Sequence, residues 1–366
     1  MKSHSSVIRL LCLGVLLAAP LVLKAEPYLA VRTGQPCATC HVNPSGGGLR
    51  SSYGAYYGAH ELPAQAGAME AFDGGQVNDS LRLGTDLRFS ASQVDFDGDE
   101  AGDARSFTTQ TGQLYLAFQP KDSPVMLYLD QQLLPGGGRN REAFVMMRLG
   151  DHSVKAGNLM LPFGLRLEDD SAFVRQASGF DFNNSDQGVE LGLNFDRLRV
   201  DVALSNGSNS QSNDDRNFQY QTRGEYVTRH WRAGGSYVLN DAEVGQRELV
   251  SLFGGFDLGG YGVLLEFSRI EDESVTNVPG IAQVQEVSLV ELNRELAQGY
   301  NLKLTAEWLN PDTAIDENER TRHSLLLEYT PYASVQLRGG IRVGEDIPQR
   351  ERGNFTRGFV QVHFYY

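Results

Sequence analysis

The stretch Val189-Glu-Leu-Gly-Leu-Asn-Phe-Asp-Arg-Leu-Arg-Val-Asp-Val-Ala-Leu204 decides the fold of this 366-residue chain. Its two arms alternate apolar with polar residues, and only Asp196 and Arg197 separate them. Because successive side chains of a β-strand point to opposite faces, each arm predicts a strand and the gap predicts a tight hairpin. The same alternation recurs from Asp79 to the C-terminus, so this part of the chain is predicted to be all-β.

The connections between the predicted strands distinguish a membrane barrel from a soluble sandwich, which would alternate in the same way. Outer-membrane barrels alternate short periplasmic turns with longer external loops. Seven short connections lie at 120–123, 150–152, 196–197, 228–230, 257–260, 297–299 and 330–333. Eight longer polar stretches lie at 95–106, 135–141, 161–185, 206–216, 240–246, 271–283, 311–320 and 345–353. Together they predict a transmembrane antiparallel β-barrel of about sixteen strands.

Both ends of the chain fit export to an outer membrane. Lys2 and Arg9, an apolar run at 10–23 and a small residue at Ala25 predict a secretory signal that is cut after that alanine. The last strand alternates up to an aromatic residue, Tyr366, and resembles the signature by which outer-membrane barrels are recognised for assembly. After cleavage, 29 basic and 46 acidic residues leave a net charge of −17, so nucleic acid is excluded as a partner.

The mature chain keeps two cysteines, and both belong to Cys37-Ala-Thr-Cys40-His41, because Cys12 lies in the signal. This C-x-x-C-H spacing is that of covalent c-type haem attachment, in which each thiol forms a thioether and the histidine becomes the proximal iron ligand. The alternative is a C-x-x-C disulfide followed by a chance histidine, since exported cysteines usually oxidise. We favour one covalent haem c, because no thioredoxin-like βαβ pattern surrounds the pair.

The distal iron ligand is sought in the same segment, residues 26–78. Besides His41, the strong axial ligands there are His60 and Met69. His60 is favoured, because the ligand nearer in sequence closes a smaller loop. A methionine of the barrel that faces the lumen, such as Met126 or Met146, remains an alternative. The nearby run 46–48 of three glycines either lets the backbone approach a flat cofactor or forms an ordinary flexible loop, and the second interpretation is favoured.

A ring of sixteen strands encloses a lumen that its own side chains do not fill, so a polar, water-filled interior is expected. The alternation places fifteen polar side chains on the inner face: Arg82, Asp86, Arg88, Asp130, Gln132, Glu142, Arg148, Glu190, Arg199, Asp201, Glu266, Lys303, Glu307, Arg338 and Arg342. Both signs occur, which is typical of charges that neutralise one another in a wet pore. The longest connection, 161–185, resembles in its position the third loop that narrows the pore of general porins.

These features together resemble the fused cytochrome-porins of the outer membrane, the monohaem iron-oxidase family. The matching residues are Pro27, Ala30, Arg32, Thr33, Gly34, Cys37, Cys40 and His41. The stretch Asn43–Tyr53 departs from the family pattern by its glycine run. The resemblance covers nearly the whole chain and implies a signal peptide (1–25), a monohaem cytochrome c segment (26–78) and an outer-membrane barrel (79–366). It places the haem segment in the lumen or at the periplasmic face, with lipid and lipopolysaccharide around the barrel.

The implied function is electron transfer across the outer membrane, by an Fe(II) oxidase that passes electrons from extracellular Fe(II) to a periplasmic c-type cytochrome. Because the hydrocarbon core is about 30 Å thick, one haem reaches both sides only from inside the barrel. Acidic residues at 95–103 and 271–273 would concentrate cations, although solvated loops are commonly acidic. Two alternatives remain open: a haem-bearing diffusion porin or transporter, and a conduit that carries electrons outward.

Replacing Cys37 or Cys40 with serine is expected to abolish a haem stain that survives denaturing electrophoresis, because each thiol supplies one covalent bond. Cys12→Ser is the matched control and should leave the stain unchanged, since that residue departs with the signal. A stain that persists in the Cys37→Ser/Cys40→Ser double variant would contradict the attachment.

Overall fold

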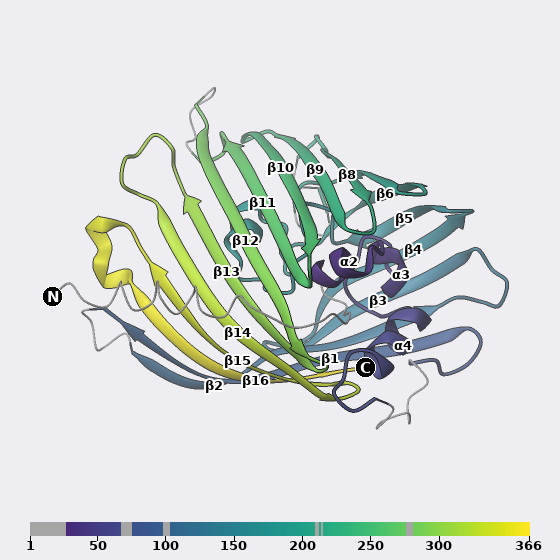
Figure 1. The fold of residues 1–366 in the computed structure, drawn as a ribbon. Coiled ribbons are helices and arrows are strands. Elements are labelled where there is room, and N and C mark those ends of the chain that lie inside the picture. The colour runs from purple at the N-terminus through teal and green to yellow at the C-terminus, as the bar shows by residue number, and fades with distance from the viewer. Residues whose placement is uncertain (1–26, 67–74, 98–102, 209–211, 214, 276–280) are drawn as a thin grey trace.

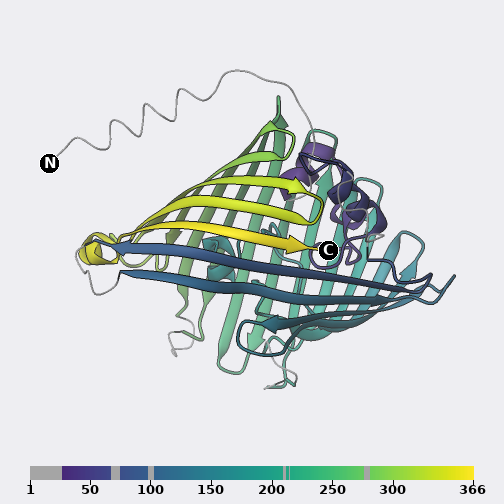
Figure 2. The same cartoon turned by 90° about the horizontal axis from the view of Figure 1, so that it is seen from below.

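The computed structural model describes residues 27–66, 75–97, 103–208, 212–213, 215–275 and 281–366. The predicted signal, Met69 and part of the first long loop lie outside them. Sixteen antiparallel strands form a closed barrel in which each strand pairs with its neighbours in sequence (Figure 1; Figure 2). β1 closes the ring by pairing with β16, from Asp86 opposite Tyr365 to Phe96 opposite Phe355. The predicted fold class and strand number are confirmed.

The strands are β1 (Leu81–Phe96), β2 (Ala104–Phe118), β3 (Val125–Leu134), β4 (Arg139–Leu149), β5 (His152–Leu159), β6 (Asp186–Phe195), β7 (Leu198–Ser205), β8 (Gln219–Val227), β9 (Trp231–Ala242), β10 (Gly245–Leu258), β11 (Tyr261–Asp272), β12 (Gln283–Ala297), β13 (Tyr300–Asn310), β14 (Arg320–Tyr332), β15 (Val335–Glu345) and β16 (Phe355–Tyr365). A short 3₁₀ helix, η2 (Pro348–Gly353), precedes the last strand.

The hairpin of β6 and β7 shows how alternation becomes a wall between lipid and lumen. Val189 and Leu191 are exposed on the outer surface, whereas Glu190 between them is fully buried on the inner side. In β7, Leu204 is likewise exposed and Asp201 is buried. An apolar outer face and a polar inner face are what a bilayer requires of a barrel. The predicted faces of this hairpin are therefore confirmed.

Two of the expected longer loops are tight connections. The expectation of a longer loop at 240–246 is wrong, because β9 and β10 extend until only Glu243 and Val244 separate them. The connection expected at 135–141 shortens in the same way to Pro135–Gly138. At both places polar residues continue the backbone hydrogen bonds between the paired strands. Their polarity therefore shows that the strands extend into water, and it does not mark where the strands end.

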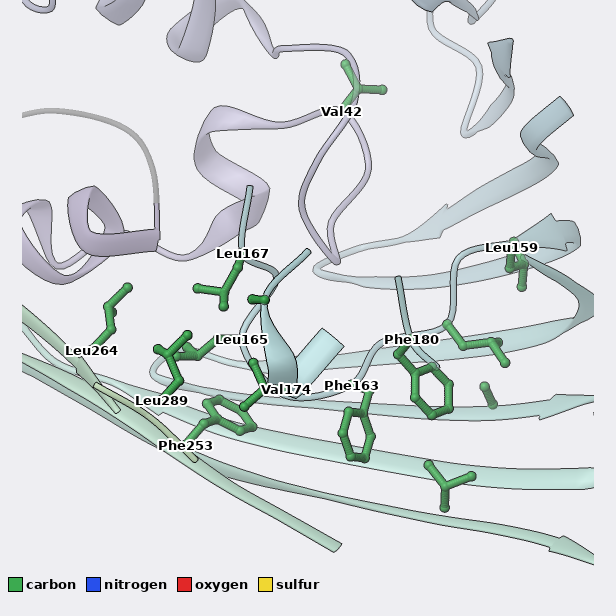
Figure 3. Packing of buried hydrophobic residues seen from close by; sticks show 14 of the residues in the cluster. Val42, Leu159, Phe163, Leu165, Leu167, Val174, Phe180, Phe253, Leu264 and Leu289 are labelled. Atoms are coloured by element: carbon green, nitrogen blue, oxygen red, sulfur yellow. The ribbon is translucent and has the colours of Figure 1, made fainter. Parts of the chain in front are cut away.

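The connection between β5 and β6, residues 160–185, folds into the lumen, and we call it the inner loop. Its short helix α5 (Phe173–Ser178) contacts β11, β12 and β13 on the far wall. Buried leucine and phenylalanine side chains of the loop pack with Phe253, Leu264 and Leu289 of the strands in one hydrophobic cluster (Figure 3). The expected inward position of this connection is confirmed. The lumen is more apolar than expected. Some inward-facing strand residues are apolar and pack against the apolar side chains of the inner loop.

The inward-facing charges are arranged as close pairs. Lys155 lies 2.7 Å from Glu190, and Arg338 lies 2.5 Å from Glu328. Arg338 also contacts Glu168 of the inner loop at 2.6 Å, so an ion pair helps to hold this loop inside the barrel. The expected mutual neutralisation is present, but it takes place between buried side chains, where an unpaired charge would be costly.

The N-terminal segment forms three short helices, α2 (Pro27–Thr33), α3 (Cys37–Cys40) and α4 (Ser52–His60), at the end of the barrel that carries the short turns (Figure 1). α2 contacts β10 and β11, and Gln65 pairs with Tyr332 at the β14–β15 turn. Because short turns are periplasmic in such barrels, the segment occupies the periplasmic end. None of the helices in the described part of the chain is long and apolar enough to span a bilayer.

The same segment touches both strands of the seam where β1 meets β16. On β1, Arg82 donates a hydrogen bond from Nη2 to Ser52 Oγ at 2.6 Å. On β16, the ring of Tyr365 lies 4.0 Å below the guanidinium of Arg50. The seam is therefore in contact with residues that follow the C-x-x-C-H motif by about ten positions.

The barrel predicts two measurements on protein purified in detergent. The far-ultraviolet circular dichroism spectrum should be dominated by β-strand, and unheated protein should migrate differently from boiled protein in electrophoresis, because a closed barrel resists unfolding by detergent. A helix-dominated spectrum would contradict the fold.

Candidate functional site

The C-x-x-C-H motif forms one helical turn on a short, rigid unit. Pro36 precedes α3 in an extended conformation, and the N–H of His41 donates to Cys37 O at 3.0 Å as the helix ends. The chain then folds back in a narrow hairpin, in which Val42 N donates to Leu49 O at 2.9 Å. The thiols of Cys37 and Cys40 are both free. Two thiols and an imidazole are thus presented within five residues of chain.

The glycine run closes this hairpin against the barrel wall. Gly46, Gly47 and Gly48 all have positive φ, between 64° and 92°, which side chains other than hydrogen rarely allow. A Cβ on Gly46 would lie 3.4 Å from Cys37 Sγ, and a Cβ on Gly48 would collide with the Tyr128 hydroxyl. The run is therefore not the ordinary flexible loop that the sequence alone favours. Its glycines are required because the backbone passes close to Cys37 and to Tyr128.

Both cysteines and His41 line a cavity between the N-terminal segment and the inner loop. Its volume is about 100 Å³, below the ~300–1,000 Å³ of ligand pockets. The segment contributes lining residues that include Tyr53 and Tyr57 of α4. The inner loop contributes the residues from Met160 to Arg166 and Phe180. The cavity is thus narrow and is built from parts far apart in sequence.

The imidazole of His41 keeps some exposed surface toward the cavity, yet the surrounding protein desolvates it. This desolvation lowers the pKa of His41 to about 4, and the positive charges of Arg50 and Arg166 act in the same direction. The ring is therefore neutral at neutral pH, which is the form that coordinates a metal ion. Its Nδ1 atom is buried and has no hydrogen-bond partner among the described residues.

Arginines surround the cavity from the inner loop and from the strands. Arg232 of β9 pairs with Glu225 at 2.7 Å, and its Nη2 lies 4.0 Å from Cys37 Sγ. On the inner loop, Arg166 Nη1 and Arg175 Nε are buried and make no hydrogen bond to any described residue. Buried guanidinium groups with unused N–H donors suit an anionic ligand group such as a carboxylate. The cavity therefore combines an apolar body with anion-binding edges.

A buried polar network fixes the segment to the inner wall of the barrel. Asn43, two residues after His41, donates from Nδ2 to both carboxylate oxygens of Glu142 at 3.1 Å. Its Oδ1 accepts from Lys155 Nζ at 3.1 Å, and Lys155 also pairs with Glu190. Asn43, Lys155 and Glu190 are all 0% exposed. Since Asn43 and Lys155 each contact more than one partner, the network holds the motif at a defined place in the lumen.

The structure treats the candidate distal ligands differently. His60 ends α4 and packs on Tyr56 with ring centroids 4.6 Å apart, and it is not among the residues that line the cavity. Met69 lies outside the described residues. Met126 and Met146 face each other on β3 and β4 within the hydrophobic cluster, and neither lines the cavity.

Met160 lines the cavity and was not singled out from the sequence. It is 4% exposed and is the first residue of the inner loop. Its backbone N–H donates to Glu142 Oε1 at 3.1 Å, and its Sδ accepts a hydrogen bond from Arg166 Nη2 at 3.0 Å. The sequence signal that could have pointed to Met160 is the long third connection, which is predicted to begin directly after it at residue 161.

A second cavity opens toward the short-turn end of the barrel. It shares Cys37, Pro36 and Ser45 with the first cavity and has a volume of about 460 Å³. Four arginines line it: Arg197, Arg199, Arg223 and Arg229. The side of the motif that carries Cys37 is therefore reached from the periplasmic end through a basic opening.

The acidic loops present no metal centre in the described part of the chain, where no group of three histidine, cysteine or acidic side chains could hold a metal ion. Glu271 and Asp272 each lie 3.0 Å from an arginine, Arg269 and Arg247 respectively. Asp99 and Glu100 of the first acidic stretch lie outside the described residues. Glu271 and Asp272 are thus engaged in ion pairs, whereas Asp95 and Asp103 accept hydrogen bonds from Gln93 and from the backbone N–H of Phe96.

Comparison with known proteins identifies the fold. No protein-family model and no curated protein matches the sequence. An anion-selective porin from Comamonas acidovorans matches with a TM-score of 0.63 at 11% identity, over 78% of this chain and 99% of the porin. A loop-deletion mutant of OmpT, an outer membrane protein of Vibrio cholerae, matches with a TM-score of 0.60 at 10% identity, over 78% and 99%. The outer membrane channel DcaP of Acinetobacter baumannii matches with a TM-score of 0.58 at 12% identity, over 78% and 97%.

The closed barrel and these neighbours define the class of protein. The chain is a porin-like β-barrel protein of the outer membrane. The neighbours are covered almost completely, and the uncovered remainder of this chain is about as long as the stretch that precedes β1.

Lys155→Met is expected to destabilise the protein by about 3–5 kcal/mol, because it leaves Glu190 buried without its cation and removes a donor to Asn43. Equilibrium unfolding in denaturant would measure the loss, and limited proteolysis should cut the N-terminal segment faster. Arg269→Met is the matched control, because its ion pairs are exposed and such pairs contribute only about 0–1 kcal/mol. Equal stability losses in the two variants would contradict the anchoring role.

Proposed function

We propose that this protein is a cytochrome-porin that carries one covalent haem c in its N-terminal segment and transfers electrons across the outer membrane. In the favoured direction it takes an electron from extracellular Fe(II), which becomes Fe(III), and reduces a periplasmic c-type cytochrome by one electron. One observation carries the proposal: Cys37, Cys40 and His41 together line one cavity that residues of the inner loop also line within the barrel.

The residues around the cavity fit a haem c. The two free thiols lie one helical turn apart, as two thioether bonds require, and the neutral His41 imidazole is suited to bind iron. The unused donors of Arg166 and Arg175 suit the two propionate carboxylates of a porphyrin. A haem bound here would supply a one-electron Fe(III)/Fe(II) couple.

The position of the cavity supports transfer between the two sides of the membrane. The bilayer core is about 30 Å thick, so a cofactor at either surface would be too far from the other. One wall of the cavity is the inner loop, which starts and ends at the external side of the barrel, and the other wall is the segment at the periplasmic end. A single site there lies between a loop that enters from the external side and a segment at the periplasmic end.

The basic second cavity supports a periplasmic partner. Its arginines, among them Arg197 and Arg229 on the short turns, would attract an acidic surface or the exposed carboxylate edge of a periplasmic cytochrome. On the outer side, the excess of acidic residues would raise the local concentration of Fe(II). The charge distribution thus matches a cationic donor outside and an acidic acceptor inside.

The porin neighbours favour one competing function, the diffusion of solutes through the lumen. The hydrophobic cluster that joins the inner loop to the far wall argues against a wide water-filled channel. Planar bilayer recordings distinguish the two, because an electron conduit with this interior should show small conductance while its haem is intact. An outward conduit would use the same residues, and redox potentiometry of the haem against candidate partners decides the direction.

Proteoliposomes that enclose a cytochrome c acceptor test the function. With external Fe(II), the parent protein should reduce the enclosed acceptor, and the Cys37→Ser/Cys40→Ser variant should lose nearly all of this activity while keeping its barrel. A flexible linker inserted near residue 74, combined with Lys155→Met to break the contact with Asn43, should keep the haem absorbance but lose most of the transfer, since it lets the segment leave the lumen. Transfer at the parent rate by either variant would overturn the proposal.

A further inference from the structure

We propose that Met160 of the inner loop is the second axial ligand of the haem iron, opposite His41. The inference rests on the proposed haem attachment and adds to it the residue that completes the iron site. Six-coordinate haems in electron-transfer proteins take a second strong ligand, and a methionine thioether is one of the common ones. Among the described residues that line the cavity, His41 and Met160 carry the imidazole and the thioether that such a pair needs.

The two proposed ligands come from different parts of the chain that meet at the cavity. His41 belongs to the segment, together with Tyr53 and Tyr57, whose helix α4 packs on α3. Met160 belongs to the inner loop. Tyr53 and Tyr57 therefore come from the same segment as His41, whereas Met160 comes from a separate part of the chain.

One carboxylate sets the relative position of the two walls. Glu142 accepts hydrogen bonds from Asn43 Nδ2 and from the backbone N–H of Met160, each at 3.1 Å. Asn43 follows His41 by two residues, so the proximal and distal sides of the site are tied to the same buried side chain. β5 has only eight residues, and the chain therefore leaves the barrel wall early enough to place Met160 beside the cavity.

The sulfur of Met160 already accepts a hydrogen bond in the structure. Its Sδ accepts from Arg166 Nη2 at 3.0 Å, which shows that a lone pair points to a polar partner in the cavity wall. Arg166 has a second, unused donor, Nη1, at the same place. When a porphyrin is attached, a propionate gives this guanidinium a stronger acceptor than the thioether, and the sulfur lone pair is free for the iron.

Spectroscopy of the covalent haem protein in detergent tests this assignment. Met160→Leu keeps the volume and apolar character of the side chain but removes the sulfur. Its ferric form should lose the weak far-red charge-transfer band of a methionine–iron bond and become high-spin, and its reduction potential should fall. The reduced variant should bind carbon monoxide faster than the parent, since no ligand has to leave.

Met160→His supplies a second, independent measurement. It should remain low-spin with the spectrum of two histidine ligands and a lower potential than the parent. Met146→Leu is the matched control, because Met146 is a fully buried methionine of the lumen that does not line the cavity. It should keep the parent spectrum.

The outcomes separate this inference from the proposed function. A parent protein without covalent haem overturns both. A parent with covalent haem, whose methionine band persists in Met160→Leu or is lost in Met146→Leu, overturns the Met160 assignment alone. A parent that shows two histidine ligands also overturns it and points to His60.

Discussion

A closed ring of sixteen strands is wider than its own side chains can fill, and the interior of this protein follows from how that space is occupied. The inner loop enters from the side of the long loops, and the N-terminal segment enters from the side of the short turns. They meet across the cavity that Cys37, Cys40 and His41 line. The width of the barrel thus creates the room for a site that neither part could enclose alone.

The interior is also electrostatically ordered. Lys155, Arg338 and Arg322 are each held within 2.7 Å of a buried carboxylate, so fixed pairs replace mobile water as the partners of these charges. Apolar residues of the inner loop fill the space between them. A metal site in such surroundings has its potential set by fixed dipoles and low solvent access, which are among the chief ways in which a protein tunes a redox centre.

The sequence predicts the strands of the barrel better than it predicts the contacts inside the lumen. Alternation in β6 and β7 identifies which side chains face lipid, because strand periodicity is a local property. The connection between β9 and β10 is misjudged, because polar residues there continue the strand into water. The proposed axial partner of His41 is harder still to predict. The argument from loop length favours His60, yet the barrel brings Met160 to the cavity although it lies 119 positions from His41. Met160 and His41 come to the same cavity because long-range strand pairing closes the barrel. The sequence pattern of the N-terminal segment alone contains no information about this pairing.

The contacts at the seam have a consequence for the order of maturation. Ser52 is bonded to β1, and Arg50 lies over the terminal part of β16, so the segment occupies the place where the first and last strands join. Once those strands have joined, the thiols of Cys37 and Cys40 line a cavity inside the barrel. Under the proposed haem attachment, an enzyme that has to surround the segment would need to act before the strands join, while the chain is in the periplasm. Loading of the cofactor would in that case come before closure of the ring.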